Sequence, residues 1–361
     1  MEIQITYKDA KFMNSSFKSD DVILLLKDIT GLVQPLSTSE REKKIQSGIH
    51  YSEMLPLEYH PSEEYVKIYE SSLKVFGQST ADAVARVADK LVKKRGSSIV
   101  IVSLARAGTP LGILIRRYIR NKYGFDCPHY SISIIRDRGI DKNAIEYILN
   151  RHNADQIQFV DGWTGKGAIY KELKKEIAVF DGLSDNLAVL ADPAYLTDLC
   201  GTHDDIMIPS SCLNCTVSGL ISRTFLRDDI IGEKDFHGAA YYKELSSEDR
   251  TYEFIEYIEK LFKYDLKPYD EPKKMDGMSD VNDLASFYGI NNINFIKPGI
   301  GETTRVLLRR VPWKVVIDER FDLSQELEHI KQLAKEKNVE IVYRHLNNYK
   351  CCGLIKQLSD I

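Results

Sequence analysis

The sequence predicts an α/β fold: a mostly parallel, twisted sheet with helices on both faces, followed by a small second α/β unit. Two observations support this prediction. Apolar strand-like runs alternate with helical patterns of about 10–15 residues, as expected for parallel strands joined by crossover helices. The runs are also continuously apolar, as in 99–104, which is typical of strands buried on both faces.

The expected elements follow this alternation along the chain, and Gly124 is expected to end one helix. A polar segment with two prolines and a glycine predicts a linker near 266–278. Before it we expect helices at 78–95, 109–124, 141–152, 168–180 and 241–265, and strands within 97–108 and at 129–135, 157–161 and 187–194. After it we expect helices at 281–289, 302–311 and 324–338, strands at 293–297, 313–318 and 340–345, and a short terminal helix.

The composition is typical of a globular protein in a reducing compartment. The chain has 361 residues, enough for two domains, and its net charge of −4 gives no overall basic field that would indicate nucleic acid. We find no signal-peptide pattern, no apolar run of membrane-spanning length, and six cysteines that are too sparse for a disulfide framework. We therefore expect a cytoplasmic protein without membrane contact, and homo-oligomer formation stays open.

The most informative stretch is 158–169, where an apolar strand ends on Asp161 and a glycine-rich turn leads into a helix. Glycines let backbone N–H groups approach a phosphate, and a helix N-terminus adds partial positive charge. We predict a phosphate-binding loop in which Asp161 holds a ribose hydroxyl or a Mg²⁺-bound water. An ordinary strand–helix turn is the alternative. The predicted phosphate-binding residues are Gly162, Thr164, Gly165, Lys166 and Gly167.

A second anion-binding loop is predicted at 103–109, between another buried strand and another helix. Arg106 offers a planar guanidinium that suits phosphate oxygens, and Gly108 lets the backbone approach. The alternative is a surface arginine in an ordinary loop. Because the carboxyl ends of parallel strands share one edge, we expect both loops there, together with 136–141 and 192–212. Two such loops predict a ligand with two separated phosphate groups.

The two loops resemble those of type I phosphoribosyltransferases, FVDGWTGKG their ribose-5-phosphate loop and SLARAG their pyrophosphate loop. The resemblance implies transfer from phosphoribosyl pyrophosphate to a base-like acceptor, with Mg²⁺ as cofactor. Asp161 and Arg106 would be catalytic, and Ala107 and Gly108 would contact the pyrophosphate. Gly162 stands where that family usually has a second acid, which favours a non-catalytic nucleotide- or RNA-binding stress protein as an alternative.

The segment RDRGID at 136–141 could supply a cationic cover over the pyrophosphate through Arg136 and Arg138. The alternative is a solvated turn whose charges form internal ion pairs, and this interpretation is at least as well supported by the sequence.

The segment 200–215 is dense in reactive residue types and permits several interpretations. Cys200, His203, Cys212 and Cys215 could form a zinc site, although the gap between the two pairs is short. Cys212 could be a nucleophile with His203 as base. An ordinary helix start is the plainest interpretation. Alternatively Asp192, His203 and Cys212 line an acceptor pocket.

The first 270 residues resemble a narrower phosphoribosyltransferase-like family of bacterial tellurite-resistance and stress clusters, some of whose members are labelled cysteine protease StiP. HYSEMLP at 50–56 and IPSSCLNCTVSGLISRT at 208–224 carry this resemblance, together with the two loops. The label implies a nucleophilic cysteine, with Cys212 as the expected residue.

The C-terminal unit resembles the Pelota-type RNA-binding domain that is appended to this family, through KPGIGETTR at 297–305. The resemblance implies that RNA approaches a helix start at Gly299 and Gly301, while Arg305, Arg309 and Lys314 meet its phosphates. A small accessory or dimerisation domain is the alternative.

We therefore predict a phosphoribosyltransferase-like domain at 1–268 and an RNA-binding-like domain at 279–361. The predicted function is a stress-linked phosphoribosyltransferase. The alternatives are the non-catalytic binding protein and a cysteine peptidase that uses Cys212.

Overall fold

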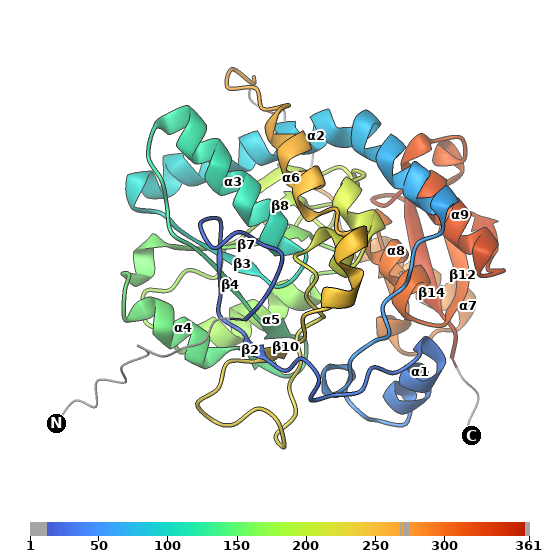
Figure 1. The fold of residues 1–361 in the computed structure, drawn as a ribbon. Coiled ribbons are helices and arrows are strands. Elements are labelled where there is room, and N and C mark those ends of the chain that lie inside the picture. The colour runs from blue at the N-terminus through green and yellow to red at the C-terminus, as the bar shows by residue number, and fades with distance from the viewer. Residues whose placement is uncertain (1–12, 268, 270–273, 358–361) are drawn as a thin grey trace.

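The computed structural model describes residues 13–267, 269 and 274–357, and it shows two α/β units packed against each other (Figure 1). The larger unit is built on a six-stranded sheet in which every neighbouring pair of strands is parallel. In spatial order the strands are β1 (Ile23–Leu24), β4 (His129–Ile132), β3 (Val100–Leu104), β7 (Ile157–Trp163), β8 (Leu187–Ala191) and β9 (Cys200–Thr202).

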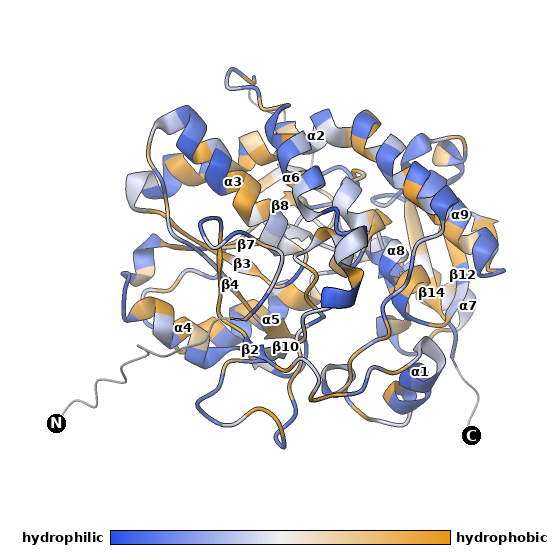
Figure 2. Ribbon diagram, in the orientation of Figure 1, coloured by the Kyte–Doolittle hydropathy of each residue, from blue (hydrophilic) through white to orange (hydrophobic). Residues whose placement is uncertain are grey.

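Helices cover both faces of this sheet because its strands are apolar on both sides. Alternate residues of β3 belong to opposite cores: Ile101 packs with one group of helices, whereas Val100 and Val102 pack with the other. Figure 2 shows the strands as largely hydrophobic and the helices as mixed. The first group comprises α2 (Glu63–Arg95), α3 (Gly108–Tyr123) and α6 (Thr251–Glu259), and the second comprises α4 (Lys142–Leu149) and α5 (Ala168–Ile177).

Within the described residues, the smaller unit is a four-stranded mixed sheet with three α-helices. Its strand order is β11 (Ile296–Pro298), β14 (Cys351–Ile355), β12 (Pro312–Ile317) and β13 (Glu340–Tyr343), and β14 runs antiparallel to both of its neighbours. The helices are α7 (Ser279–Tyr288), α8 (Ile300–Arg309) and α9 (Glu328–Glu336). Shorter elements elsewhere are α1 (Thr38–Gln46), β2 (Lys27–Asp28), β5 (Ile134–Ile135), β6 (Gly139–Ile140) and β10 (Gly238–Ala239).

The two units share one hydrophobic core. Ile300, Leu307 and Leu333 of the smaller unit belong to the same cluster of buried residues as Ile101 and Leu111 of the larger. Helix α2 lies across the top of the molecule in Figure 1 and reaches α9 at one end. The interface is therefore part of the folded core, and it positions α8 against the carboxyl edge of the large sheet.

The predicted mixed α/β architecture with a mainly parallel sheet is confirmed. Its assignment as phosphoribosyltransferase-like stays a prediction, as do the boundaries at 268 and 279. The predicted linker includes 268 and 270–273, which lie outside the described residues. Within the described residues, we find no helix that is both long enough and apolar enough to span a bilayer.

Three predicted elements differ from the structure. The helix expected at 78–95 begins at Glu63, where the Ser62 hydroxyl accepts the Tyr65 N–H as an N-cap. The helix expected at 241–265 is a 3-10 segment, Lys243–Glu248, followed by the shorter α6. The expected terminal helix is instead β14, whose residues are all buried because the strand lies in the interior of the small sheet.

Candidate functional site

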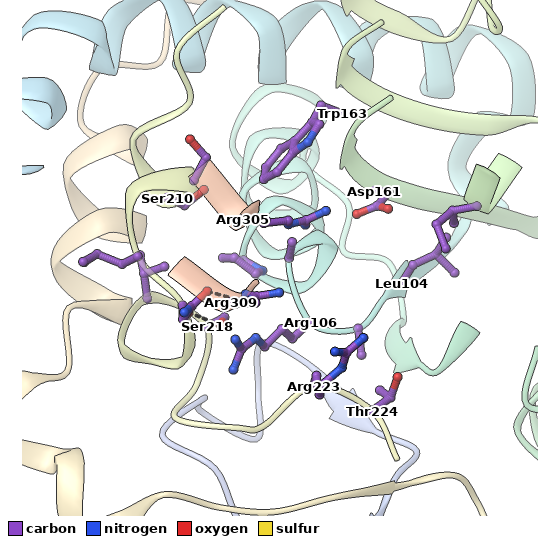
Figure 3. A pocket seen from close by; sticks show the side chains of 18 of the residues that line it. Leu104, Arg106, Asp161, Trp163, Ser210, Ser218, Arg223, Thr224, Arg305 and Arg309 are labelled. Atoms are coloured by element: carbon purple, nitrogen blue, oxygen red, sulfur yellow. Dashed lines mark hydrogen bonds between the residues drawn. The ribbon is translucent and has the colours of Figure 1, made fainter. Parts of the chain in front are cut away.

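Four arginines surround a cavity between the two units (Figure 3). Arg106 follows β3, Arg223 comes from the segment after the 3-10 turns at 209–217, and Arg305 and Arg309 project from α8. The cavity has a volume of about 160 Å³, and we call it the arginine pocket. Asp161 lines it as well. The structure therefore brings the predicted loops at 103–109 and 161–167 together, as expected from neighbouring parallel strands.

The loop after β3 places Arg106 at the floor of this pocket. Its Nη1 donates to Glu58 Oε1 at 3.0 Å and to the Ile221 carbonyl at 2.6 Å. Burial acts to lower the pKa of Arg106, but Glu58 and, to a smaller extent, Cys215 and Tyr242 together raise it above its usual value. Gly108 permits the arrangement, because a Cβ there would lie 2.9 Å from the Val160 carbonyl oxygen of β7. Ala107 also lines the pocket.

Asp161 lies at the other side of the pocket, beside the aromatic ring of Trp163. Its Oδ1 accepts the Gly162 N–H at 2.7 Å. Burial raises the pKa of Asp161 to about 6, although nearby Arg305 acts to lower it. The carboxyl group therefore changes charge close to neutral pH.

The predicted phosphate cradle at 161–167 is not open in this structure, because the loop is engaged by protein groups. The Thr164 hydroxyl donates to Asp192 Oδ1 at 2.5 Å. The Lys166 ammonium donates to the carbonyls of Ile293 and Ile296 in the smaller unit. Burial lowers the pKa of Lys166 to about 7.

The glycines of this loop are covered as well. A Cβ on Gly165 would lie 2.9 Å from Glu302, and one on Gly167 would lie 2.6 Å from Leu196. A Cβ on Gly162 would lie 3.2 Å from Leu111. The sequence pattern of a phosphate loop is present, but the smaller unit and the segment after β8 occupy the space that a phosphate would need.

The predicted cationic cover also differs from the structure. Arg138 pairs with Glu53 at 2.5 Å, and Arg136 pairs with Asp137 at 2.9 Å. Neither lines the arginine pocket, although Arg136 lines an adjoining cavity. Arg136 forms an ion pair within the segment, as the alternative of a turn with internal ion pairs expects, whereas Arg138 pairs with Glu53 outside it.

The predicted RNA contact at the start of α8 is occupied by protein. Asp205 Oδ1 accepts the Ile300 N–H at 3.0 Å, so a carboxylate already caps the helix after Gly299. Gly301 packs on Trp163, and a Cβ there would lie 2.2 Å from the indole ring. RNA therefore has no access to this helix end in the structure.

The predicted RNA-binding cations are separated. Arg305 and Arg309 face the arginine pocket, whereas Lys314 on β12 pairs with Glu340 of β13. The five residues predicted to bind RNA thus do not form one surface.

A second polar cluster joins Asp192, after β8, to Cys200 and His203 of β9 and the turn that follows it. Cys200 Sγ lies 3.5 Å from His203 Nε2. His203 Nδ1 lies 2.9 Å from the Asp192 carbonyl oxygen and 3.5 Å from Asp192 Oδ2. The Tyr195 ring stacks on the imidazole with 4.3 Å between centroids. We call Asp192, Cys200 and His203 the Cys–His–Asp cluster.

Cys212 is not part of this cluster, and its predicted roles in an acceptor pocket and as nucleophile stay predictions. Its side chain is fully buried in the main core, and the Tyr65 hydroxyl donates to its carbonyl oxygen at 2.7 Å. Burial raises the pKa of the Cys212 thiol well above its usual range, so the reactive thiolate is disfavoured.

The Cys–His–Asp cluster is also the group with metal-ligand spacing among the described residues. Its thiol and imidazole groups suit zinc better than Mg²⁺, which prefers oxygen ligands. Cys212 lies apart from this cluster in the main core, so the possible four-ligand zinc site of Cys200, His203, Cys212 and Cys215 is not assembled in the structure. The Mg²⁺ assignment stays a prediction.

Sequence reasoning missed three residues that shape the arginine pocket: Glu58, Trp163 and Arg223. Arg223 lies in the stretch 208–224 that carried the family resemblance, but this stretch has no helical or strand period to indicate where its side chains point. Glu58 and Trp163 are single residues whose roles depend on contacts with distant segments.

Comparison with known proteins corrects the functional prediction. Residues 15–259 match the family described as tellurite-like stress resistance cysteine protease StiP, and residues 275–357 match the PELOTA RNA binding domain. A protein of Acinetobacter baylyi named cysteine protease StiP is 38% identical over 368 residues, covering 96% of this chain and 95% of the relative. The predicted phosphoribosyltransferase activity is therefore wrong, and the peptidase alternative agrees with these names. The chain belongs to the StiP family and carries a Pelota RNA-binding domain at its C-terminal end.

Proposed function

We propose that this protein is a cysteine peptidase in which Cys200, rather than Cys212, is the nucleophile. The observation that carries the proposal is the Cys–His–Asp cluster, in which a thiol lies 3.5 Å from an imidazole that an aspartate holds from its other side. A nucleophile, a base and a group that orients the base are the elements that thiol and serine peptidases use. The names of the family and of the relative support the same class of reaction.

The hydrogen bonds assign the protons in the cluster. His203 Nδ1 is 2.9 Å from a backbone carbonyl oxygen, which can only accept a hydrogen bond, so Nδ1 carries the proton. Nε2 then presents its lone pair to the Cys200 thiol. Asp192 is itself fixed, because its Oδ2 accepts the backbone N–H groups of Leu196 and Thr197.

In the proposed reaction His203 Nε2 takes the thiol proton, and the Cys200 thiolate attacks the peptide carbonyl carbon. The C–N bond breaks, a thioester to Cys200 forms, and the leaving amine takes the proton from His203. Water then attacks the thioester, so that a carboxylic acid leaves and the thiol is restored.

Access to the cluster needs a local opening. Cys200 is 1% exposed and His203 is 8% exposed. The Tyr195 ring covers the imidazole, so this ring must move before a peptide reaches the thiol. The proposal therefore predicts that replacing Tyr195 by alanine increases the rate at which Cys200 is alkylated.

The test is alkylation of the folded protein by iodoacetamide, mapped by mass spectrometry, together with cleavage of unfolded casein. We expect Cys200 to react before Cys212, and His203→Asn to slow its reaction. Cys200→Ala should abolish cleavage, whereas Cys212→Ala, the matched control, should retain it once circular dichroism confirms that it folds.

Two outcomes would overturn the proposal. One is cleavage that persists in Cys200→Ala. The other is stoichiometric zinc in the purified protein that disappears in Cys200→Ala, because the cluster would then be a metal site.

A second function, binding of single-stranded RNA, is favoured by an exposed patch on the smaller unit. Phe287 and Trp313 are 61% and 38% exposed, and Tyr288 lies between them with centroid distances of 4.9 and 5.5 Å. Arg344 lies over Phe287 and Lys314 over Trp313. Aromatic rings beside cations suit stacked bases and their phosphates. We call these five residues the aromatic patch.

The patch is tested by fluorescence anisotropy with a single-stranded oligouridine. Trp313→Ala and Phe287→Ala should each weaken binding by about 1–3 kcal/mol, the range for loss of one stacked base. Leu323→Ala is the matched control, because Leu323 is 95% exposed and outside the patch. Equal binding by all variants would place any RNA contact elsewhere.

A further inference from the structure

The arginine pocket is not used by the proposed peptidase chemistry. It gathers four arginines, and carboxylates of the protein compensate only part of their positive charge. Figure 3 shows Arg106, Arg223, Arg305 and Arg309 converging on one cavity, with Asp161 and Trp163 at its edge. The arginines come from three separate segments of the chain. Guanidinium groups repel one another at close range, so such a gathering costs free energy unless negative charge compensates it.

Only part of this charge is compensated within the protein. Glu58 pairs with Arg106, and Glu302 pairs with Arg305. Among the described residues, no carboxylate lies within ion-pair distance of Arg223 or Arg309. Arg309 Nε donates instead to the neutral Asn214 Oδ1 at 2.7 Å, and Arg223 lies over the Tyr51 ring at 4.1 Å.

The pKa values reflect the same imbalance. Burial first, and then the neighbouring arginines with Arg41 foremost, lower the pKa of Arg223 to about 9. Burial and Arg106 act in the same direction on Arg309, whose pKa is well below its usual range. Two guanidiniums therefore lie in a site that disfavours their charge as the protein stands.

Several donors at this site also lack acceptors. Within the described part of the chain, Arg106 Nε and Nη2 and Arg223 Nε are buried without a hydrogen-bond partner. Arg106 is 6% exposed, so bulk water does not satisfy these groups. Buried donors without acceptors are uncommon in folded proteins, and they indicate a ligand that supplies oxygen atoms.

The space continues beyond the pocket. A second cavity of about 220 Å³ shares Arg223, Arg305 and Arg309 with it. Three further cations line this adjoining cavity: Arg136, Lys297 and Arg310. An anion held between Arg223 and Arg309 would therefore have room for a second charged group next to it.

We propose that the arginine pocket binds a small molecule that carries linked phosphate groups, with its terminal phosphate between Arg223 and Arg309. A phosphate dianion matches the two uncompensated guanidiniums in charge, and its oxygens accept from the free N–H groups. The remaining phosphate lies in the adjoining cavity.

The position of the pocket gives the ligand a structural effect. Arg106 and Arg223 belong to the larger unit, whereas Arg305 and Arg309 belong to α8 of the smaller unit. A ligand that contacts both pairs joins the two units and removes their mutual repulsion. Binding therefore stabilises the folded chain, because the unfolded chain offers no such site.

The test uses inorganic pyrophosphate as the probe on the full-length protein, with calorimetric titration and thermal unfolding. We expect measurable binding and a rise in Tm. Arg309→Gln and Arg223→Gln should each weaken binding about tenfold or more, because each removes one charge-assisted contact. Arg120→Gln is the matched control, since Arg120 is an exposed arginine at the far end of α3.

Absence of binding, or equal binding in Arg309→Gln, Arg223→Gln and the wild type, would overturn the proposal. Circular dichroism checks that each arginine variant folds. If one of the two misfolds, the other still tests the proposal. A competition arm identifies the source of the phosphate: displacement of pyrophosphate by oligouridine would show that the pocket binds an RNA backbone, which also overturns it. The result is independent of casein cleavage.

Discussion

The loop after β3 (103–109) and the loop after β7 (161–167) have the same sequence design but end in different surroundings. Each follows a buried parallel strand, contains glycine and a cation, and leads into a helix. In the first, Arg106 faces a cavity and keeps two donors free of protein partners among the described residues. In the second, Lys166 donates to carbonyls of the smaller unit.

The difference arises from what covers each strand end. Glycines and cations give a loop the capacity to bind an anion, but a second unit that docks on the loop can take up that capacity. The smaller unit closes the β7 loop and at the same time supplies Arg305 and Arg309 to the space in front of the β3 loop. We therefore expect an anion to bind in front of the β3 loop rather than at the β7 loop.

The largest expected effect concerns the buried ion pair that fixes the β3 loop. Glu58→Ala should lower the free energy of unfolding by about 3–5 kcal/mol, because it leaves the Arg106 charge buried without its carboxylate. The two side chains are 3% and 5% exposed, so water cannot replace the pair. Chemical denaturation followed by circular dichroism measures the change.

The control is Asp229→Ala, which breaks the exposed Arg227–Asp229 pair and should cost about 0–1 kcal/mol. Equal losses of stability from the two substitutions would mean that Glu58 does not stabilise the buried charge of Arg106. The β3 loop would then not be fixed by this ion pair.

A smaller loss of stability is expected for a substitution at the contact between the smaller unit and the β7 loop. Gly301→Ala should cost about 1–3 kcal/mol, the range for overpacking a filled core. The added Cβ would lie 2.2 Å from the Trp163 ring, so either the indole or α8 must shift. Denaturation monitored by tryptophan fluorescence reports both the stability and the Trp163 environment.

Gly232→Ala is the matched control for this substitution. Its Cβ would lie 3.3 Å from Asp235 Oδ2, a tight contact with the end of a side chain that can shift on an exposed segment, so only a small change is expected. If Gly301→Ala also left the free energy of unfolding nearly unchanged, α8 would not pack tightly against the β7 loop in solution.

The sequence predicted the sheet because its evidence is local. Continuous apolar runs such as Val100–Leu104 require burial on both faces, and this fixes a parallel sheet with helices on each side. The same logic placed Arg106 and Asp161 at one edge, since the strands that precede them are neighbours. These predictions did not require knowledge of which distant segments pack against each other.

The sequence could not predict which protein groups cover the candidate site, because this depends on contacts between distant segments. Trp163 and Gly301 meet only when the two units dock, and Asp205 caps α8 only in that arrangement. Cys212 attracted attention through its spacing to Cys215, but reactivity depends on burial and on the neighbouring base. Cys200 is as buried as Cys212 but has the His203 imidazole 3.5 Å from its sulfur, and the sequence paired these two residues only as possible zinc ligands.

The smallest effect concerns the charge of Asp161, which opposes an anion in the arginine pocket. Its carboxyl has a pKa of about 6, raised by burial against the influence of Arg305, with Glu302 and the Gly162 N–H as its other neighbours. Below that pH the group is neutral and the pocket is more positive. Affinity for sulfate, whose own charge stays constant over this range, should therefore rise about tenfold between about pH 7.5 and pH 5.

Asp161→Asn should remove most of this pH dependence and bind sulfate more tightly than the wild type above pH 6, because the amide is neutral throughout. Asp181→Asn, an exposed carboxylate outside the pocket, is the control and should behave as the wild type. A pH dependence that persists in Asp161→Asn would assign it to another group in the pocket. In that case the β7 loop would contribute no controlling charge, and the β3 loop and α8 alone would determine anion affinity.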